Sequence, residues 1–385
     1  MTADNPNSPN VDSLFAYHRI VVKAGTSLLT GGSPDLNTGE MLHLVGQIAE
    51  LRKNNCEVLL VTSGAVAAGR QALGQPRERR DVPFRQMLAA VGQGRLMHAY
   101  QEMFAQHSIV VAQALLTHDD MAKRQGYLNV RDSLLGLLEM GVVPIVNEND
   151  VVTSEELGDE VFGDNDTLSA LVANLVDADL LVMLTDIPGV YTADPNIHPD
   201  ATFVSRVENV AGMIEKVAKD ETLHSWSRGG MRAKLEAARL ATSWGIPVII
   251  AQGDRHGLLV DLARGNEQGT FFSPTGDKIE SRKRWLLSGL STRGELRIDE
   301  GAVDALRTFN RSLLPAGVYD VRGGFERHDV VIIADASGRR IACGVANYSA
   351  DDITTIKGLQ SRGIQEALGY HYGDEVVHRN NLALL

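Results

Sequence analysis

Short apolar runs alternate with helical patterns over the first 272 residues, and this alternation restricts the fold more than any other feature. The runs are apolar throughout, as expected of strands that are covered on both faces. They occupy residues 20–22, 58–61, 109–112, 142–146, 180–184 and 247–251. Helical spacing occupies residues 40–54, 84–106, 121–139, 167–176 and 230–243. Strands separated by helices predict an α/β fold, a three-layer αβα sandwich on a largely parallel sheet.

The pattern changes after residue 272, where turn-forming residues and a basic run indicate a linker. Short strand-like runs separated by turn signals follow, and they predict a small β-rich domain. The first residues are rich in Pro, Asn, Ser and Asp, which is typical of a mobile tail. The expected order is a tail (1–16), the α/β domain (17–272), the linker (273–284), the β-rich domain (285–373) and a C-terminal tail (374–385).

Composition narrows the class of protein. The chain has 385 residues and a formal net charge of −12, with 44% hydrophobic and 22% charged residues, as in ordinary globular proteins. Two cysteines, Cys56 and Cys343, cannot form a disulfide framework or a cysteine-based zinc site. No signal-peptide pattern or membrane-length apolar run occurs, so we expect a cytoplasmic protein without a membrane anchor.

Polar turns follow the first two predicted strands. In the first turn, Gly25 allows close backbone approach, Thr26 adds a hydroxyl, and Lys23 could place its charge beside a phosphate. In the second turn, Ser63 and Gly64 precede a helix, where N–H groups could bind a carboxylate or phosphate. Both turns also have an ordinary structural explanation, a solvated lysine and a serine helix cap.

Two further polar clusters point to chemistry. The strand over 142–146 runs into four polar residues, Asn147 to Asp150, which could bind the ammonium group of an amino acid. Asp164, Asn165 and Asp166 precede an apolar helix. One acid is enough to cap a helix, whereas two acids beside an asparagine suit Mg²⁺ or the orientation of catalytic lysines.

Two more segments could contact a nucleotide. Thr185 and Asp186 open a loop that could hold adenine or ribose, although its proline and glycine also explain it as a turn. The segment 228–234 contains a glycine pair at the start of a helix, where N–H groups suit phosphates. Each segment alone has a structural explanation, and the combination of all six favours a functional site.

Taken in order, these segments resemble the amino acid kinase family over about residues 20–255. The matching stretches are VVKAGTSLLT, VTSGAVAAG, PIVNENDVV, GDNDTLSALVA, MLTDIPGVYTADP and GGMRAKLEAA. The NEND and GDND motifs and the YTADP loop look most like the members that phosphorylate glutamate. Residues 288–373 resemble a PUA domain, and a kinase followed by this module is a distinctive pairing.

The resemblance implies transfer of a phosphoryl group from ATP to the γ-carboxylate of L-glutamate, the first step of proline synthesis, with Mg²⁺ as cofactor. It implies that Lys23 and Lys234 stabilise the phosphoryl group and that Asp166 holds both lysines. Asp164 would act through Mg²⁺ or a neighbouring residue. The implied glutamate ligands are Ser63, Asn147, Asp150 and Asn165. The implied ATP ligands are Lys23, Gly25, Thr26, Thr185, Asp186, Arg228, Gly229, Gly230, Met231, Arg232, Ala233 and Lys234.

The resemblance also implies feedback inhibition by proline, transfer of the labile product to a γ-glutamyl phosphate reductase, and a homo-oligomer, either a dimer or a tetramer. PUA domains often bind RNA, but residues 285–385 carry 11 basic and 13 acidic residues. We therefore do not expect RNA binding to be the main role. Two alternatives stay open: a kinase for another acyl acceptor such as N-acetylglutamate, and an RNA-binding module with a degenerate kinase half.

The chain departs from the family pattern at two places. Ser227-Arg228 stands where the family usually has Gly-Thr, so Arg228 would have to replace a threonine contact to phosphate. The stretch between Asp150 and Gly163 is slightly long and acidic, which could change how glutamate or an effector is held.

Overall fold

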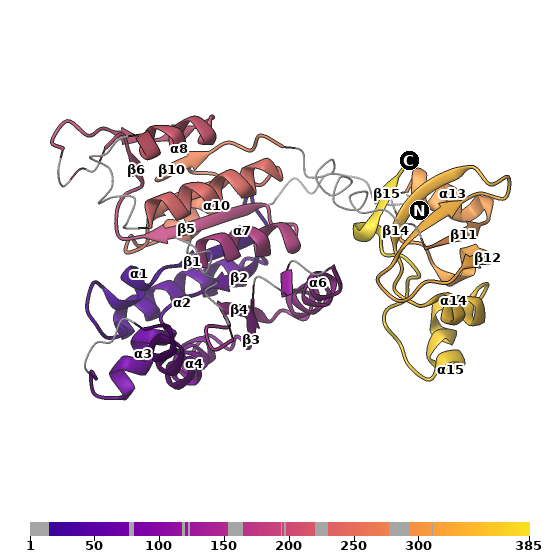
Figure 1. The fold of residues 1–385 in the computed structure, drawn as a ribbon, viewed down its shortest axis with the longest axis horizontal. Helices are drawn as coiled ribbons and strands as arrows, with labels where there is room; N and C mark the ends of the chain where they lie inside the picture. Colours follow the sequence, from indigo (N-terminus) through magenta and orange to yellow (C-terminus); the bar gives the residue numbers. More distant parts are fainter. Residues whose placement is uncertain are drawn as a thin grey trace, which may run out of the picture. The chain divides into compact units, whose positions relative to one another are not determined.

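The structure is a computed structural model of the 385-residue chain. It describes residues 15–76, 81–117, 120–121, 124–152, 165–193, 195, 198–219, 230–276, 293–309 and 311–385. The chain divides into two compact units, residues 1–277 and 278–385, which are described separately (Figure 1).

The first unit is built on an eight-stranded sheet with the order β3-β4-β2-β1-β5-β9-β10-β8. The strands are β1 (Arg19–Ala24), β2 (Glu57–Val61), β3 (Val111–Leu116), β4 (Val143–Glu148), β5 (Leu180–Thr185), β8 (Arg206–Val207), β9 (Val248–Gln252) and β10 (Thr270–Phe272). The six strands from β3 to β9 in this order are parallel, and β10 is antiparallel to β9. A separate hairpin pairs β6 (Val190–Tyr191) with β7 (Phe203–Val204). The expected largely parallel sheet is confirmed.

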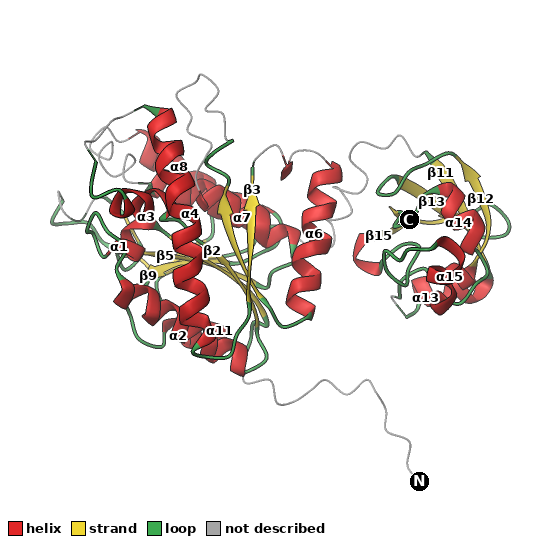
Figure 2. Ribbon diagram, turned by 90° about the horizontal axis from the view of Figure 1, so that it is seen from below, coloured by secondary structure: helices red, strands yellow, loops and turns green. Residues whose placement is uncertain are grey.

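Helices cover both faces of this sheet, as Figure 2 shows. One face packs against α1 (Thr26–Thr30), α2 (Thr38–Lys53), α3 (Ala65–Ala72), α4 (Val82–Ala105) and α11 (Leu258–Ala263). The other packs against α6 (Arg124–Glu139), α7 (Asn165–Leu175), α8 (Val210–Lys219) and α10 (Met231–Ser243). Strand side chains alternate between the faces, so Ile20 and Val22 enter the first core and Val21 enters the second.

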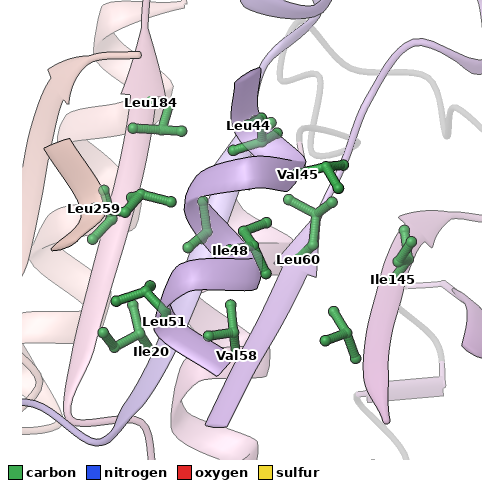
Figure 3. Packing of buried hydrophobic residues seen from close by; sticks show 14 of the residues in the cluster. Ile20, Leu44, Val45, Ile48, Leu51, Val58, Leu60, Ile145, Leu184 and Leu259 are labelled. Carbon is green, nitrogen blue, oxygen red and sulfur yellow. The ribbon is translucent and has the colours of Figure 1, made fainter. Parts of the chain in front are cut away.

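The helix α2 illustrates how the first core forms. Its apolar residues recur at helical spacing, and Leu44, Ile48 and Leu51 pack against strand residues such as Val58 and Leu60 (Figure 3). The Asn37 side chain caps the start of the helix by accepting hydrogen bonds from the first-turn N–H groups. The apolar spacing therefore predicted this helix to within about two residues.

One strand lies further along the chain than predicted. We expected a strand over 109–112, but β3 runs over Val111–Leu116. Ser108 has a positive φ of 58° at the turn after α4, and Val110 is 67% exposed. Because β3 is an edge strand that pairs with β4 alone among the described strands, most of its residues are half-buried and lack the continuous apolar run of the central strands.

Two glycines let α3 and α4 pack closely. A Cβ atom at Gly69 would collide with the backbone carbonyl of Leu88, and one at Gly92 would collide with that of Ala65. The backbones of the two helices thus approach more closely than side chains would permit. This contact holds the start of α3 against α4.

The second unit contains a five-stranded sheet with the order β12-β11-β13-β14-β15. Its strands are β11 (Gly294–Ile298), β12 (Val318–Gly323), β13 (Val330–Ala334), β14 (Arg340–Val345) and β15 (Leu382–Leu384). Its helices are α13 (Glu300–Arg307), α14 (Ala350–Ile356) and α15 (Ile364–Leu368), with the 3₁₀ turns η2 (Pro315–Gly317), η3 (Ser361–Gly363) and η4 (Arg379–Asn381). The expected β-rich architecture is confirmed.

The segment 374–385, which we expected to be a tail, packs into this sheet. Val376 and Val377 are fully buried, and β15 pairs with β14. Short apolar stretches separated by the polar residues 378–381 gave too little periodicity to predict this strand. None of the helices among the described residues combines the length and the apolar composition of a membrane span.

Candidate active site

Four parallel strands of the first unit bring predicted residues to one edge of the sheet. Lys23 lies near the end of β1, Ser63 follows β2, Asn147 lies near the end of β4, and Thr185 ends β5. Parallel strands end at the same edge, and ligands of such sheets bind there. Residues separated by up to about 160 positions in the sequence thus become neighbours.

Lys23, Asp166 and Lys234 form a buried charge cluster. Lys23 Nζ lies 2.6 Å from Asp166 Oδ1, and Lys234 Nζ lies 3.1 Å from Asp166 Oδ2. The side chains of Lys23, Asp166 and Lys234 are 4%, 1% and 13% exposed, respectively. They come from β1 and from the first turns of α7 and α10. One carboxylate therefore holds two ammonium groups, which leaves the cluster with an excess positive charge.

The charge of Asp166 is maintained by these partners. Burial alone would raise the pKa of its carboxyl, but the charges and hydrogen bonds of the two lysines outweigh burial and hold the pKa below its usual value. Asp166 is consequently ionised at neutral pH. Both lysines remain oriented at the end of the sheet.

Glycines leave room for the two ammonium groups. A Cβ atom at Gly25 would lie 3.3 Å from Lys23 Nζ, and one at Gly230 would lie 3.5 Å from Lys234 Nζ. Gly230 caps α10 with a φ of 85° and no side-chain hydrogen bond. Within the described part of the chain, Gly230 provides no side-chain cap, so the first N–H groups of α10 could bind an anion beside Lys234.

A cavity of about 560 Å³ lies beside this cluster. Its lining includes all four predicted glutamate ligands, Ser63, Asn147, Asp150 and Asn165. Thr26, which the resemblance implies as an ATP ligand, lines the same cavity. The wall also holds two arginines that the sequence analysis did not select, Arg70 of α3 and Arg85 of α4.

Hydrogen bonds join three of the cavity residues. Asn165 Nδ2 donates to Ser63 Oγ and to Asn147 Oδ1, each at 3.1 Å. Asn165 is followed directly by Asp166, so adjacent residues at the start of α7 serve the cavity and the lysine cluster. This adjacency couples the two halves of the site.

Asp150 is a carboxyl group in a partly desolvated position. Burial raises its pKa above the usual value, and the positive charge of Arg85 partly counters that effect. A half-buried carboxylate without full compensation favours a cationic ligand. An amino acid's ammonium group would supply that charge.

The residues predicted to hold the nucleotide are less closely connected. Thr185 is buried at the end of β5 and donates a hydrogen bond of 3.0 Å to the exposed Asp186. On α10, Met231 is buried, Arg232 is exposed and Ala233 is half-buried. Asp164, Arg228 and Gly229 lie outside the described residues, as do Ser227 and the acidic stretch 153–163.

Sequence reasoning missed Arg70, Arg85 and Gln93. Gln93 Oε1 accepts a hydrogen bond of 2.8 Å from Asn147 Nδ2. Arg70 lies on the short helix that begins at Gly64, so its spacing from Ser63 could have indicated it. Nothing in the local sequence marks Arg85 or Gln93, because both lie within a helix that reads as ordinary amphipathic structure.

Comparison with known proteins agrees with this architecture. The amino acid kinase family matches residues 18–252, more than half of the chain. The chain belongs to the amino acid kinase family. A PUA domain matches residues 294–368 in the second unit. This member therefore combines a kinase domain with a PUA domain.

Similar family members extend over nearly the whole chain. A glutamate 5-kinase of Dehalococcoides mccartyi is 50% identical over 369 residues, 96% of this chain and 99% of its own length. A glutamate 5-kinase of Herpetosiphon aurantiacus is 47% identical and covers 95% of this chain and 98% of its own. A UMP kinase structure from Bacillus anthracis covers 68% of this chain and 97% of its own, with a TM-score of 0.47 and 16% identity.

Proposed function

We propose that this amino acid kinase family member transfers a phosphoryl group from ATP to the γ-carboxylate of L-glutamate, giving γ-glutamyl phosphate and ADP. The observation that carries the proposal is the Lys23–Asp166–Lys234 cluster beside a cavity lined by amide, hydroxyl and carboxyl groups. The full-length relatives named glutamate 5-kinase support the same activity. The reaction would be the first step of proline synthesis.

The chemistry needs charge neutralisation more than acid–base catalysis. A carboxylate is already a nucleophile, so no residue has to remove a proton from it. The barrier comes from repulsion between the substrate carboxylate and the phosphoryl oxygens, and from their alignment. Lys23 and Lys234 would place two fixed positive charges on the phosphoryl oxygens as negative charge redistributes in the transition state. Asp166 would keep both lysines in position without touching the reacting atoms.

The cavity offers complementary groups for glutamate. The negative charge of Asp150 would bind the α-ammonium group, and Arg70 would favour a carboxylate. The Ser63 hydroxyl and the N–H groups at the start of α3 would bind the second carboxylate. A free amino group is thus part of the recognition, which separates glutamate from N-acetylglutamate.

We assign no described residue to the binding of Mg²⁺. No group of three or more Asp, Glu, His or Cys side chains capable of holding a metal occurs among those residues. Asp166 is already engaged by two ammonium groups. Asp164, which the resemblance connects with Mg²⁺, lies outside the described residues. Mg²⁺ in kinase sites is held largely by the substrate phosphates and one or two carboxylates, so the steps above use only the lysines and the cavity.

We also propose the remaining partners that the family resemblance implies. They are proline as a feedback inhibitor, a γ-glutamyl phosphate reductase that receives the labile acyl phosphate, and a second copy of the chain in a homo-oligomer. We propose a cytoplasmic location, which is compatible with two buried cysteines that are not joined in a disulfide bond. Inhibition by added proline and the mass in solution test the first and third of these proposals.

A hydroxamate trap tests the reaction. The purified chain would receive ATP, Mg²⁺, hydroxylamine, and either L-glutamate or N-acetyl-L-glutamate. Hydroxylamine attacks an acyl phosphate and releases phosphate, so hydroxamate formed from free glutamate alone is the expected result. Preference for N-acetyl-L-glutamate would contradict the role of Asp150, and hydroxamate from neither acid would contradict the proposed activity.

A further inference from the structure

A continuous chain of hydrogen bonds runs from helix α4 to the cavity. It connects Gln93, Asn147, Asn165 and Ser63 through bonds of 2.8, 3.1 and 3.1 Å. Gln93 is half-buried in α4 and does not line the cavity, whereas the other three residues do. The described hydrogen bond from Gln93 toward the cavity runs through Asn147.

The direction of this chain is set by a backbone group. The N–H of Glu148 can only donate, and it donates to Asn147 Oδ1 at 2.9 Å and to Asn165 Oδ1 at 3.3 Å. The oxygens of both asparagines are thereby identified by their partner. Asn147 must then turn its Nδ2 toward Gln93, and Asn165 must turn its Nδ2 toward Asn147 and Ser63.

Gln93 completes this order. It presents Oε1 to Asn147, while its buried Nε2 has no hydrogen-bond partner among the described residues. Leaving a buried donor unpaired is unfavourable, so the Gln93 amide does not use its full hydrogen-bonding capacity here. Its oxygen instead accepts the hydrogen bond that Asn147 Nδ2 donates in its fixed orientation.

The order determines what Ser63 offers to the cavity. Ser63 Oγ accepts a hydrogen bond from Asn165, and the described residues give its hydroxyl proton no acceptor. The proton is therefore available to a ligand in the cavity that can accept it. A carboxylate oxygen is such an acceptor, and an ammonium group is not.

We propose that Gln93 is a positioning residue that holds Asn147 in the orientation selected by the Glu148 N–H, so that Ser63 donates its hydroxyl proton to a carboxylate oxygen of the substrate. The inference rests on the proposed glutamate kinase activity and adds a residue that contacts no substrate. Without the Gln93 acceptor, Asn147 loses the partner of its Nδ2, and the amide orientations become less restricted. Ser63 would then spend part of its time as a donor to Asn165.

The test is a double-mutant cycle on the full chain with Gln93→Met and Ser63→Ala. Ser63→Ala should raise the KM for glutamate about tenfold, the size of one hydrogen bond to a charged group. Gln93→Met should raise it by a smaller factor, because Ser63 keeps its hydroxyl and loses the required orientation only part of the time. The kcat should stay within about twofold, because the lysine cluster is unchanged. The double variant should be no worse than Ser63→Ala alone, since both changes remove the same hydrogen bond.

Gln101→Met is the matched control, because Gln101 lies on the same helix and is exposed. It should leave KM and kcat unchanged. Glutamate affinity would also be measured by calorimetry without ATP. Because partial unfolding weakens the apparent affinity by the folded fraction, that fraction would be measured for each variant by urea unfolding and the affinity corrected for it. Gln93→Leu provides a second variant with the same expectation.

An unchanged KM in the Gln93 variants, or a double variant whose effect is the product of the single effects, would overturn the positioning role. Those outcomes leave the proposed function intact if the wild-type chain forms hydroxamate from glutamate. A wild-type chain that neither binds nor phosphorylates glutamate would overturn both proposals.

Discussion

Replacing Asp166 with asparagine tests the charge cluster directly. The substitution keeps the shape of the side chain but leaves the ammonium groups of Lys23 and Lys234 without their shared counter-charge. Lys23 is 4% exposed, so water cannot replace that counter-charge. Removing one partner of a buried ion pair costs about 3–5 kcal/mol, and we expect a loss of that size in the free energy of unfolding.

The effect on catalysis should be larger than the effect on substrate binding. Loss of one preorganised electrostatic group typically lowers kcat about 10²–10³-fold, and Asp166→Asn disturbs two lysines at once. We therefore expect kcat to fall at least about 10³-fold. The dissociation constant for glutamate should change less than about twofold, because Asp166 does not line the cavity.

The control lies at the other end of the same strand. Arg19 of β1 pairs with Glu57 at 2.6 Å, but both side chains are about one quarter exposed, at 24% and 29%. Such a pair contributes about 0–1 kcal/mol, so Glu57→Gln should change the urea midpoint little and leave kcat unaltered. Both variants would be compared by urea unfolding and by the hydroxamate assay. Similar urea midpoints, or a kcat within tenfold of wild type in Asp166→Asn, would refute the reasoning.

The same carboxylate should make stability depend on acidity. Its pKa is held below the usual value, so its ionised form stabilises the folded state above the unfolded-chain pKa of about 3.9. That stabilisation is lost as the pH falls through the lower, folded-state pKa. Urea midpoints measured from neutral to acidic pH should therefore fall less steeply in Asp166→Asn than in wild type, and parallel curves would contradict the assignment.

Other expected outcomes concern the glycine and the arginine of the site. Gly25→Ala places a Cβ atom 3.3 Å from Lys23 Nζ and should lower kcat about tenfold by displacing the ammonium group. Gly46→Ala on α2 is the control, because its Cβ atom would meet no atom within 4 Å, and it should leave kcat unchanged. Equal kcat values in Gly25→Ala and Gly46→Ala would contradict this account. Protonation of Asp150 should raise the KM for glutamate as the pH falls. Because the charge of Arg85 lowers the pKa of Asp150, Arg85→Met should shift the rise in KM to higher pH. A pH profile of KM that does not shift would mean that Asp150 does not bind the ammonium group.

The sequence predicted the features that depend on local periodicity. The apolar runs of β1, β2, β4, β5 and β9 are continuous because these strands are covered on both faces, which makes their pattern readable. The polar residues at their ends could be selected because parallel strands end at one edge. The pairing of Asp166 with Lys23 was implied by the family resemblance, because Asp166 begins a helix and does not end a strand.

Features that depend on long-range packing could not be predicted in this way. β15 consists of only three residues, and its apolar character becomes meaningful only beside β14. Gln93 faces Asn147 because Gly69 and Gly92 let α4 approach α3, an interaction between separate helices. Arg85 lines the cavity from an exposed position on α4, and its local sequence resembles any charged helix surface.

Transfer of an isotope from the substrate tests the central claim most directly. L-Glutamate labelled with ¹⁸O in its γ-carboxylate would be incubated with ATP, Mg²⁺ and the chain, and the phosphate released when the product cyclises would be analysed by ³¹P NMR. A phosphoryl group attacked by the γ-carboxylate must carry one ¹⁸O atom into that phosphate. We predict labelled phosphate from the wild-type chain, and at least about 10³-fold slower release from Asp166→Asn. Unlabelled phosphate would mean that water attacks the phosphoryl group, which would contradict the account.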